Sequence, residues 1–582
     1  MRFFELCEYL EKLEGTASRN EMTVILAEMY KEMNPEEAKL ATYLVQGQLG
    51  PGFASPNMGI AEKQLIKAFG SEMEQMFKKA GDLGTAIEET KNDNEKSKKP
   101  EIKEVFEKLI EMAKVEGTGS QEIKQKLIRD LVEELDGRSA KYVIRIILSK
   151  LRTGFSDMTI LDALSWMIVS DKSLRKEIEK MYNMRADLGE ITEEIVRNKK
   201  PRNLGPELGT PVIMAKCERA TKASEIWKRM GTPLRPTGFG GAGCAVEYKL
   251  DGLRIQCHIT NSKIKLFSRG LEDMTAMFPD VVSGLKSQIK KNCIVEGEMI
   301  AVSGDGKTLA FNKTMNRKRK YDIDKMAEEI PMAIFLFDVL MVDNKSVIDK
   351  PNSERWETLE NMITSPLTPL HNYGEGNVRG EVVRLMPRII ANNTEDIQRM
   401  FDKALKEGME GIVAKRLNAP YTPGSRDFAW IKMKPVLDSV DVVVMGYSVG
   451  EGKRTDFGIG EFLVGVYDSK QDKYLTVSKV GSGATDEEWR RLKNELKKLE
   501  VNEKPESYIV TKQYEQDYWV RPSLVLEVAA SEISVSPAHS SGYGLRFPRL
   551  ISWREKIPSD ATSVIEIAKL FKMQKVGDSD GS

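Results

Sequence analysis

Histidines are few in this chain of 582 residues, and its cysteines do not form metal-binding patterns. There are three histidines, His258, His371 and His539, and five cysteines without a Cys-x-x-Cys pair. A structural zinc site needs about four such side chains at close spacing, so the sequence excludes a zinc-finger or zinc-ribbon protein. Cysteines inside apolar segments and without a disulfide framework fit a reducing compartment, and we expect a cytoplasmic protein.

Excess charge and long apolar runs are also missing. The 88 lysines and arginines balance the 88 aspartates and glutamates, so the chain as a whole lacks the basic excess of many nucleic-acid-binding proteins. Local clusters of cations can still form a basic surface. The longest apolar run, Pro331 to Val342, is too short to span a bilayer and contains Asp338. The N-terminus carries Glu5 and Glu8 and no apolar signal-peptide core, so we expect no membrane partner.

Composition divides the chain into three regions, in line with a length that predicts three or four domains. Residues 1 to 215 have apolar residues at helical spacing and predict a helical region, with a charged flexible linker from Glu88 to Pro100. Strand patterns mixed with a few helices follow from 216 to 435. Short strands and one helix from 436 to 582 predict a small closed barrel such as an OB-fold.

Two segments of the C-terminal region are expected to be irregular. Gly542 to Arg549 is rich in glycine and basic residues, which predicts a loop. Lys572 to Ser582 ends the chain in small and polar residues, which predicts a disordered tail.

Two strands are predicted around residue 250. Cys244 to Tyr248 is a short apolar run, and after it Arg254, Gln256 and His258 alternate with apolar residues. An Asp-Gly pair between such runs is a strong signal for a β-hairpin, which we therefore predict at Asp251-Gly252.

A lysine, Lys249, stands at the mouth of this predicted turn. A lysine amine attacks electrophiles only in its neutral form, and partial burial and nearby cations lower its pKa enough to make it a nucleophile. The alternative is an exposed lysine on a surface hairpin, and Lys-x-Asp-Gly alone favours that interpretation. The segments downstream decide between the two.

Further charged residues lie on strands predicted downstream. Val295 to Ala301 is a strand with alternating acids, and Ala333 to Leu340 is a nearly continuous apolar run that predicts a buried strand. Glu410 to Lys415 and Trp430 to Lys434 are strands that end in lysines. The basic run Asn316 to Tyr321 is either a solvated loop or a phosphate contact.

In this order the motifs resemble those of the ATP-dependent DNA ligases, most closely the three-domain archaeal and eukaryotic type. The shared motifs are Glu247-Tyr-Lys-Leu-Asp-Gly-Leu-Arg254, Ser268-Arg-Gly270, Val295-Glu-Gly-Glu298, Phe335-Leu-Phe-Asp338, Glu410-Gly-Ile-Val-Ala-Lys415, Trp430-Ile-Lys-Met-Lys434 and Leu545-Arg-Phe-Pro-Arg549. Gly137 to Arg145 and Lys150 to Gly154 look like the family's helical DNA-binding domain. The resemblance implies an all-α N-terminal DNA-binding domain (1–215), an α+β, ATP-grasp-like nucleotidyltransferase core (216–435) and a C-terminal β-barrel of the OB-fold type (436–582).

The same resemblance implies an enzyme that seals 5′-phosphate/3′-hydroxyl nicks in duplex DNA during replication, repair and recombination. Lys249 would attack the α-phosphate of ATP and carry AMP, the AMP would pass to the 5′-phosphate, and the 3′-hydroxyl would displace it. Each step is an in-line displacement at phosphorus, which needs positioning and charge neutralisation. Mg²⁺ bound by carboxylates would supply part of that charge.

Roles for single residues follow from the family's motifs. The implied metal ligands are Glu298 and Glu410, for which a buried salt bridge with a lysine is the alternative. The implied nucleotide contacts are Glu247 and Phe337 at the adenine, Glu298, and the cations Arg254, Arg269, Arg426, Lys415, Lys432 and Lys434. The implied DNA contacts are Arg138, Lys141, Arg152, Arg317, Lys318, Arg319, Lys320 and Arg546. Arg554 and Lys556 would close over ATP, in a motif that is one residue shorter here than in the family.

Other functions also fit the Lys-x-Asp-Gly core. RNA ligases and mRNA-capping guanylyltransferases share it, and a non-catalytic scaffold that binds DNA ends is an alternative of another class. The helical region and Leu545 to Arg549 favour a DNA ligase, while ADP or NAD in place of ATP stays open. From the resemblance we expect a monomer near the nucleoid and a sliding-clamp partner, although Glu88 to Pro100 lacks the glutamine and paired aromatics of a clamp-binding segment.

Overall fold

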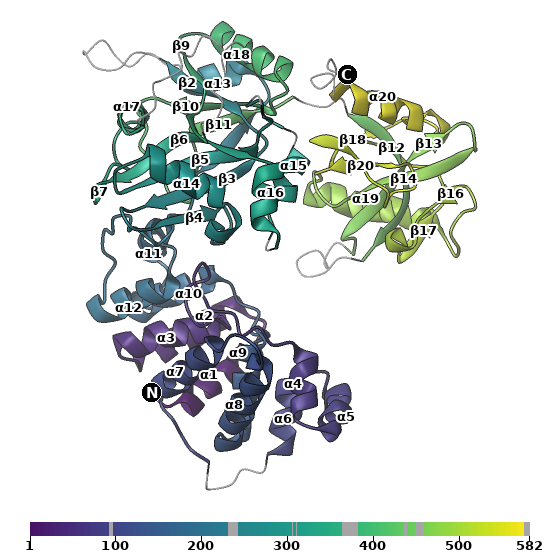
Figure 1. The fold of residues 1–582 in the computed structure, drawn as a ribbon. Coiled ribbons are helices and arrows are strands. Elements are labelled where there is room, and N and C mark those ends of the chain that lie inside the picture. The colour runs from purple at the N-terminus through teal and green to yellow at the C-terminus, as the bar shows by residue number, and fades with distance from the viewer. Residues whose placement is uncertain are drawn as a thin grey trace. The chain divides into compact units, whose positions relative to one another are not determined.

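The fold of the chain is described by a computed structural model (Figure 1). It describes residues 1–91, 97–230, 243–304, 306–309, 311–319, 321–363, 382–435, 439–449 and 458–574. Two compact units form, and each is treated by itself: residues 1–218, 229–392 and 414–431 make the first, and 219–228, 393–413 and 432–582 make the second. Within the described ranges, no helix is both long and apolar enough to cross a membrane.

Helices fill the N-terminal region, as predicted (purple to blue in Figure 1). Leu6, Leu10 and Leu13 of the first helix are fully buried, so the helical spacing of apolar residues marks the inner face. The predicted linker lies between α6 and α7, and its residues 92–96 fall outside the described ranges. The helices are α1 (Phe3–Glu14), α2 (Arg19–Lys31), α3 (Pro35–Val45), α4 (Glu62–Ala68), α5 (Ser71–Ala80), α6 (Leu83–Thr90), α7 (Ile102–Ala113), α8 (Ser120–Glu134), α9 (Gly137–Ile147), α10 (Asp157–Val169), α11 (Arg175–Met184) and α12 (Leu188–Asn198).

Two sheets follow in the central region. One has the strand order β1-β11-β10-β2-β9, and the other has the order β4-β3-β5-β6-β7 with β8 beside β6. The strands are β1 (Lys216–Ala220), β2 (Cys244–Lys249), β3 (Leu253–Ile259), β4 (Ile264–Ser268), β5 (Cys293–Ala301), β6 (Met332–Val342), β7 (Lys345–Ser346), β8 (Val383–Leu385), β9 (Arg388–Ala391), β10 (Gly411–Arg416) and β11 (Arg426–Met433). The helices are α13 (Ala223–Met230), α14 (Pro279–Gln288), α15 (Phe311–Arg317), α16 (Ile323–Glu329), α17 (Asn352–Glu360) and α18 (Thr394–Lys406). β6 is buried along almost its whole length, as its apolar sequence predicts.

The predicted hairpin at Asp251-Gly252 is wrong, although both flanking strands exist. β2 and β3 lie in different sheets, and β3 pairs with β4 and β5 instead. A side chain at Gly252 would not fit, because its Cβ would lie 2.6 Å from the carbonyl oxygen of Met299 on β5. The turn therefore carries the chain from one sheet to the other and leaves Lys249 at the point of transfer.

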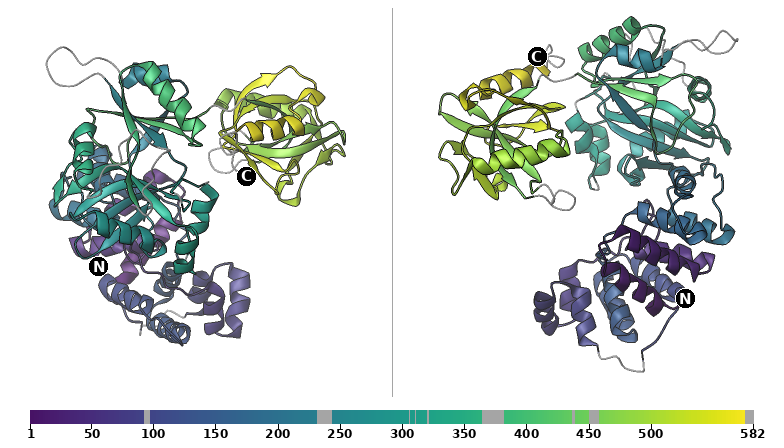
Figure 2. Two further views of the ribbon diagram at one scale, coloured as in Figure 1. Left: turned by 45° about the horizontal axis from the view of Figure 1, so that its top comes forward. Right: turned by 180° about the vertical axis from the view of Figure 1, so that it is seen from behind.

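Strands dominate the C-terminal region, together with one long helix (green to yellow in Figures 1 and 2). The main sheet has the order β15-β17-β12-β13-β14-β16, and β18 pairs with both β12 and β21. Trp489 and Leu492 of α19 share an apolar core with Phe462 of β13. The elements are β12 (Val440–Ser448), β13 (Glu461–Asp468), β14 (Lys473–Val480), α19 (Asp486–Lys498), β15 (Glu500–Val501), β16 (Tyr508–Ile509), β17 (Tyr518–Val520), β18 (Val525–Ala529), β19 (Glu532–Val535), β20 (Tyr543–Arg546), β21 (Arg549–Arg554) and α20 (Val564–Gln574).

Two predictions of irregular structure in this region are wrong. The segment Gly542 to Arg549 contains β20, which pairs with β19, and the first residue of β21. Leu545 is buried in the apolar core, and the neighbouring glycines conceal the alternation of this short strand in the sequence. The predicted tail begins inside α20, whose Ile567 is fully buried, while residues 575–582 lie outside the described part.

Side chains of β3 hold the segment that connects α12 to β1. The N–H of Gly209 donates to His258 Nδ1 at 3.0 Å, and the N–H and carbonyl of Val212 bond to the amide of Gln256 at 2.8 and 3.1 Å. Burial lowers the pKa of His258 to about 3, with a smaller contribution from the charge of Lys265. The imidazole is therefore neutral at physiological pH and carries the acceptor lone pair that the Gly209 bond requires.

Acid should destabilise the chain through His258. The unfolded imidazole protonates below about pH 6.5 and the folded one only near pH 3, so its contribution to stability is present above pH 6.5 and is lost as the pH falls. Between pH 8 and pH 5, the free energy of unfolding should fall by about 2 kcal/mol more in the wild type than in His258→Gln. Urea unfolding at the two pH values measures this difference, and an equal pH dependence would contradict the buried neutral imidazole.

Candidate active site

Lys249 ends β2, and Glu298 of β5 lies near it. Burial raises the pKa of the Glu298 carboxyl to about 7, against the opposing charges of Lys249 and Arg254 and a hydrogen bond from the Gly252 N–H. The glycine that lets the chain turn thus also contacts this carboxyl group. Lys249 is only partly buried, so a ligand can reach its amine.

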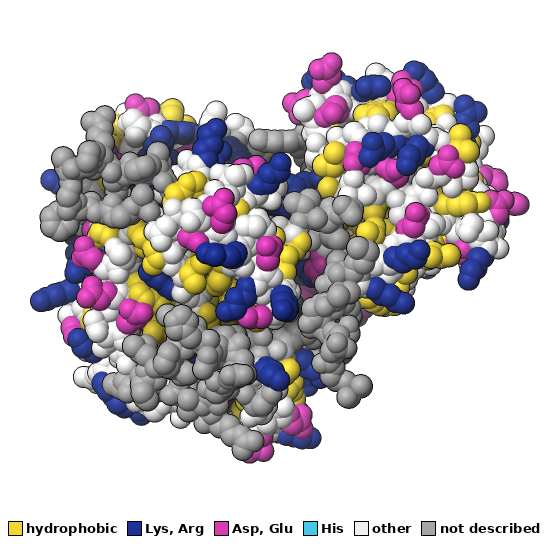
Figure 3. All heavy atoms as spheres, turned by 90° about the horizontal axis from the view of Figure 1, so that it is seen from above, with side chains coloured by type: hydrophobic (Ala, Val, Ile, Leu, Met, Phe, Trp, Pro, Cys, Tyr) yellow, Lys and Arg dark blue, Asp and Glu magenta, His cyan; other side chains and the backbone are white. Residues whose placement is uncertain are grey.

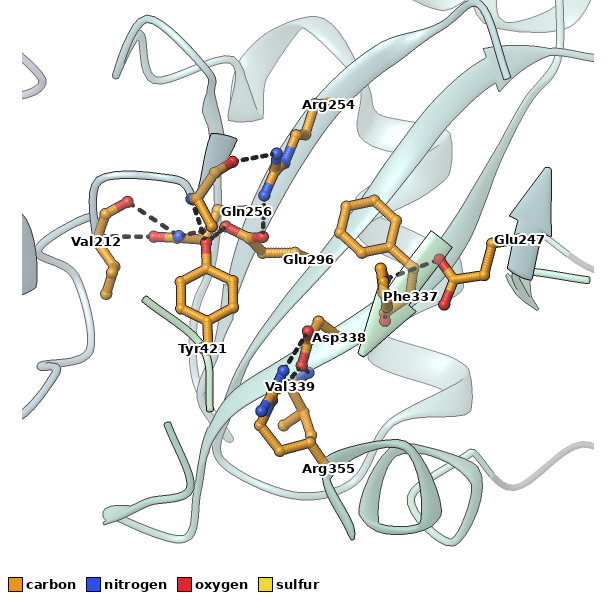
Figure 4. Close-up of polar contacts among 12 residues, drawn as sticks. Val212, Glu247, Arg254, Gln256, Glu296, Phe337, Asp338, Val339, Arg355 and Tyr421 are labelled. Carbon is orange, nitrogen blue, oxygen red and sulfur yellow. Dashed lines mark hydrogen bonds and ion pairs between the residues drawn. The ribbon is translucent and has the colours of Figure 1, made fainter. Parts of the chain in front are cut away.

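Glu247 lies two residues before Lys249 and is 2% exposed. Its Oε2 pairs with Lys415 Nζ at 2.7 Å, and that ammonium also donates to the Phe337 carbonyl at 3.0 Å (Figure 4). The ammonium lies 4.4 Å from the ring centre of Phe337 and 4.3 Å from that of Trp430. Burial raises the pKa of Glu247, and the charge of Lys415 opposes this most strongly.

The second oxygen of Glu247 indicates what kind of ligand fits here. Among the described atoms, Glu247 Oε1 is buried without a hydrogen-bond donor. A buried carboxylate oxygen without a donor is costly, so a ligand with an amino group on a planar ring fits this position. Adenine has such a group, and Phe337 and Trp430 offer aromatic surface near the carboxylate. These residues therefore fit the base of ATP.

Arg254 of β3 lies beside the same aromatic surface. Its NH1 donates to the Ala215 carbonyl and its NH2 to Glu296 Oε2, both at 2.7 Å (Figure 4). Burial alone would lower the pKa of Arg254, but the charge of Glu296 outweighs it and raises that pKa. The guanidinium lies 5.4 Å from the ring centre of Phe337. A cation is thus fixed next to the place where the base fits.

The remaining cations predicted at the nucleotide lie on or next to β4, β10 and β11. Glu410 precedes β10 and forms an ion pair with Lys434, which follows β11, so the salt bridge considered as an alternative for this acid exists. Lys432 lies on β11 and is partly buried. Arg426 and Arg269 are exposed.

Metal binding was tested on the described residues. No group of three or more His, Cys, Asp or Glu side chains among them could hold a metal ion. Mg²⁺ commonly keeps several waters and takes one or two carboxylates together with phosphate oxygens. Glu298 and Glu410 therefore fit Mg²⁺ in the presence of a nucleotide, and do not form a metal cage of their own.

The cations predicted to contact DNA from α9 are paired with acids of other helices. Arg138 contacts two glutamates of α1 at 3.0 and 3.1 Å, and Lys141 contacts one of α6 at 3.1 Å. Lys141 is only 9% exposed, so most of its charge faces the interior. Arg152, beyond the end of α9, is exposed.

The predicted basic run does not form one exposed strip. Arg317 ends α15, is 1% exposed and pairs with Asp280 at 2.8 Å, so this geometry does not favour a DNA contact. Lys318 pairs with a glutamate at 2.6 Å, and Arg319 is exposed. Lys320 lies outside the described residues.

The predicted cations of the C-terminal region also have acidic partners. Arg546 of β20 is exposed and stands opposite a glutamate of β19. Arg554 pairs with Asp441 and Glu527 at 3.0 Å, and Lys556 pairs with Asp441 at 2.6 Å. On the face drawn in Figure 3, Lys and Arg side chains are likewise interspersed with Asp and Glu, as expected for a chain of zero net charge.

Several residues next to the site were not singled out from the sequence. Arg355 of α17 donates to both carboxylate oxygens of Asp338, at 2.7 and 2.9 Å, and Tyr421 donates to Glu296. Gln256 of β3 also bonds to Glu296. A signal existed only for Gln256, because long polar residues alternate on β3, but such a face is normally interpreted as exposed.

Family models match almost the whole chain. Residues 2–165 match the DNA ligase N terminus, residues 214–434 the ATP dependent DNA ligase domain, and residues 455–557 the ATP dependent DNA ligase C terminal region.

Curated relatives match over nearly their full length. A probable DNA ligase of Dictyoglomus turgidum is 38% identical, with 99% of this chain and 98% of the relative aligned. A DNA ligase of Hyperthermus butylicus is 35% identical over the same shares. The solved structure named Pmar-Lig_PreS3 covers 95% of this chain and 99% of its own, with a TM-score of 0.51 and 15% identity, which supports the fold alone.

Removal of the buried cation should cost more than removal of an exposed one. Lys415→Met leaves the Glu247 carboxylate without its partner and should lower the free energy of unfolding by about 3–5 kcal/mol. The double variant Lys415→Met/Glu247→Leu should recover most of that loss, since neither charge is then buried. Lys325→Met, which breaks an exposed pair with Glu329, should cost under about 1 kcal/mol. Denaturant unfolding measures all three, and equal costs for the two single variants would contradict the buried pair.

Proposed function

Because the chain belongs to the ATP-dependent DNA ligases and seals nicks in duplex DNA, we propose that Lys249 is the nucleophile that receives AMP. The observation that carries this assignment is the position of Lys249 at the end of β2, two residues after the buried acceptor of Glu247 and near Glu298. An amine at this position lies between the residues that fit the base and an acid that fits the phosphates.

Three displacements at phosphorus make up the reaction. First, the neutral Lys249 amine attacks the α-phosphorus of ATP, so that a P–N bond forms and the bond to pyrophosphate breaks. Next, the 5′-phosphate of the nick attacks the same phosphorus and takes AMP from the lysine. Finally, the 3′-hydroxyl attacks the 5′-phosphorus, the phosphodiester forms and AMP leaves. The protein contributes position and charge, because in-line displacement needs little else.

The proposed nucleotide contacts surround Lys249 in sequence and in the sheets. Glu247 would accept the adenine amino group, and Phe337 would stack on the ring. Arg254 and Lys415 are fixed beside Phe337 and would meet the sugar and the phosphates. We assign the remaining contacts to the phosphates, where cations neutralise charge: Arg269, Arg426, Lys432 and Lys434.

Mg²⁺ is proposed as the metal of this site. Glu298 and Glu410 would hold it together with phosphate oxygens, and it would offset the charge on the phosphates. The Glu410–Lys434 ion pair supports an electrostatic role for this position, since a cation already binds the carboxylate.

The proposed domains follow the family. Residues 1–215 would be an all-α DNA-binding domain, 216–435 the nucleotidyltransferase core and 436–582 an OB-fold. DNA contacts are proposed for the exposed Arg152, Arg319 and Arg546 and, after exchange of their acidic partners, for the paired cations: Arg138, Lys141, Arg317 and Lys318. We assign a further contact to Lys320 from its sequence position alone. The proposal takes the chain as a monomer, with a sliding clamp as an expected partner.

Two cations of the C-terminal region would act in the first step. Arg554 and Lys556 would leave Asp441 and Glu527 to meet the pyrophosphate side of ATP and return afterwards. The same region would then contact DNA through Arg546.

Substitution of Lys249 tests the nucleophile. Lys249→Ala should abolish sealing with ATP, and Lys249→Arg should fail as well because its guanidinium stays protonated. Sealing of a pre-adenylylated nick should survive in part, since the last step does not use this amine. Lys263→Ala, an exposed lysine close by, is the matched control and should seal normally. Wild-type sealing by Lys249→Ala in a gel assay would rule out the assignment.

Acid substitutions test the metal site. Glu298→Ala and Glu410→Ala should each lower turnover by about 100-fold, because charge neutralisation at the phosphates is worth several kcal/mol. Raised Mg²⁺ or Mn²⁺ should restore part of the rate if the carboxylates bind metal. Titration of turnover against each metal, alongside thermal unfolding, measures both effects. A collapse of thermal stability without rescue would assign the two acids to salt bridges instead.

Deletion of residues 1–215 tests the DNA-binding domain. Transfer of AMP to Lys249 should persist, whereas affinity for nicked duplex should fall by about 100-fold or more at moderate salt. For the full chain, the logarithm of the association constant should fall linearly with the logarithm of the salt concentration, since each phosphate contact releases counterions. Fluorescence anisotropy with a labelled nick gives both values. Equal affinity of the truncated and full chains would contradict the domain assignment.

A further inference from the structure

A closed ring of hydrogen bonds lies behind Arg254 (Figure 4). Arg254 NH1 donates to the Ala215 carbonyl and NH2 donates to Glu296 Oε2, both at 2.7 Å. The Tyr421 hydroxyl donates to Glu296 Oε1 at 2.9 Å and accepts the Ala215 N–H at 2.9 Å. The ring thus begins and ends at the backbone of one residue, Ala215, in the segment that connects α12 to β1.

Gln256 joins this ring to the rest of the connecting segment. Its Nε2 donates to Glu296 Oε1 at 3.0 Å and to the Val212 carbonyl at 3.1 Å. Its Oε1 accepts from the Val212 N–H at 2.8 Å and lies 2.9 Å from His258 Nε2. Since His258 Nδ1 accepts from the Gly209 N–H, Nε2 carries the proton and donates. All four hydrogen-bonding positions of the Gln256 amide are therefore occupied.

Burial makes each of these hydrogen bonds important. Gln256 and Glu296 are fully buried, and Tyr421 is 2% exposed. In such surroundings hydrogen bonds are stronger than in water, and a lost partner is costly. Strand pairing sets the geometry, because Gln256 of β3 stands directly opposite Glu296 of β5. The network therefore rests on the sheet and holds both the arginine and the connecting segment to it.

We propose that Glu296, Tyr421 and Gln256 are positioning residues, which through this network hold the Arg254 guanidinium at the nucleotide and fix residues 209–215. The inference rests on the proposed function, which places Arg254 at the nucleotide. One further donor of Arg254 points to this ligand, since its Nε is buried without an acceptor among the described atoms. A nucleotide oxygen would complete it. A long side chain held by two other donors reaches that oxygen without losing its own rotamer freedom again.

Single-atom substitutions in the full chain separate this role from a structural one. Tyr421→Phe removes the hydroxyl that joins Glu296 to Ala215, and Glu296→Gln removes the charge that holds Arg254. Tyr43→Phe is the matched control, because its hydroxyl also donates to a buried carboxylate, Asp187, at 2.8 Å. Thermal unfolding compares the stability loss of the three variants, and adduct formation on Lys249 is followed against ATP concentration.

The ATP dependence decides the proposal. Tyr421→Phe and Glu296→Gln should raise the ATP concentration for half-maximal adduct formation by about tenfold or more, and Tyr43→Phe should not change it. An unchanged ATP dependence in Tyr421→Phe, at a stability loss like that of Tyr43→Phe, would overturn the positioning role. If Glu296→Gln fails to fold, Tyr421→Phe alone decides. Absence of any adduct in the wild type would instead overturn the proposed function.

Limited proteolysis tests the hold on the connecting segment. Gln256→Met keeps the length of the side chain but removes its donors and its acceptor, so trypsin should cleave faster after the exposed Lys199 and Arg202. The rate should stay near the wild-type value in Tyr43→Phe. An unchanged cleavage rate in Gln256→Met would overturn the part of the proposal that concerns residues 209–215.

Discussion

The central sheets bury charge, and buried charge must be neutralised nearby. Three carboxylates from three strands each meet a cation: the pairs are Glu247–Lys415, Glu296–Arg254 and Asp338–Arg355, each at 2.7 Å. The acids lie on β2, β5 and β6, whereas the cations come from β10, β3 and α17. Because the partners come from different elements, the sheets can form only in the arrangement that brings all six together. The site is built on this arrangement, since two of the pairs contain residues assigned to the nucleotide.

Much of the fold could be predicted from the sequence, because local periodicity reports burial directly. The apolar faces of α1 and the continuous run of β6 are where the pattern predicts them. The hairpin at Asp251-Gly252 could not be rejected from the sequence. Its residues suit a tight turn, and only the approach of Met299 shows that the glycine is needed for a change of sheet. The strand β20 was missed because two glycines interrupt its alternation and its pairing with β19 is not a local property.

The site could be predicted in part. Ordered motifs locate Lys249, Glu247 and Glu298, because a turn between strands and the acids near it follow the chain. They do not show that Lys141 and Arg317 are buried against acids, since the sequence does not specify which partners a cation meets. The polar face of β3 was visible as an alternation, but only the structure shows that this face is covered by residues 209–215 and Tyr421. Charges whose partners are distant in sequence are what the pattern cannot report.

Peptide mapping by mass spectrometry tests the central claim most directly. The wild-type chain is incubated separately with ATP, GTP and NAD in the presence of Mg²⁺, and the modified residue is identified after digestion. The account predicts AMP on Lys249 after incubation with ATP, because the donor that fits Glu247 Oε1 is the amino group of adenine. GMP on Lys249, AMP on a different residue, or no adduct with any of the three nucleotides would contradict it.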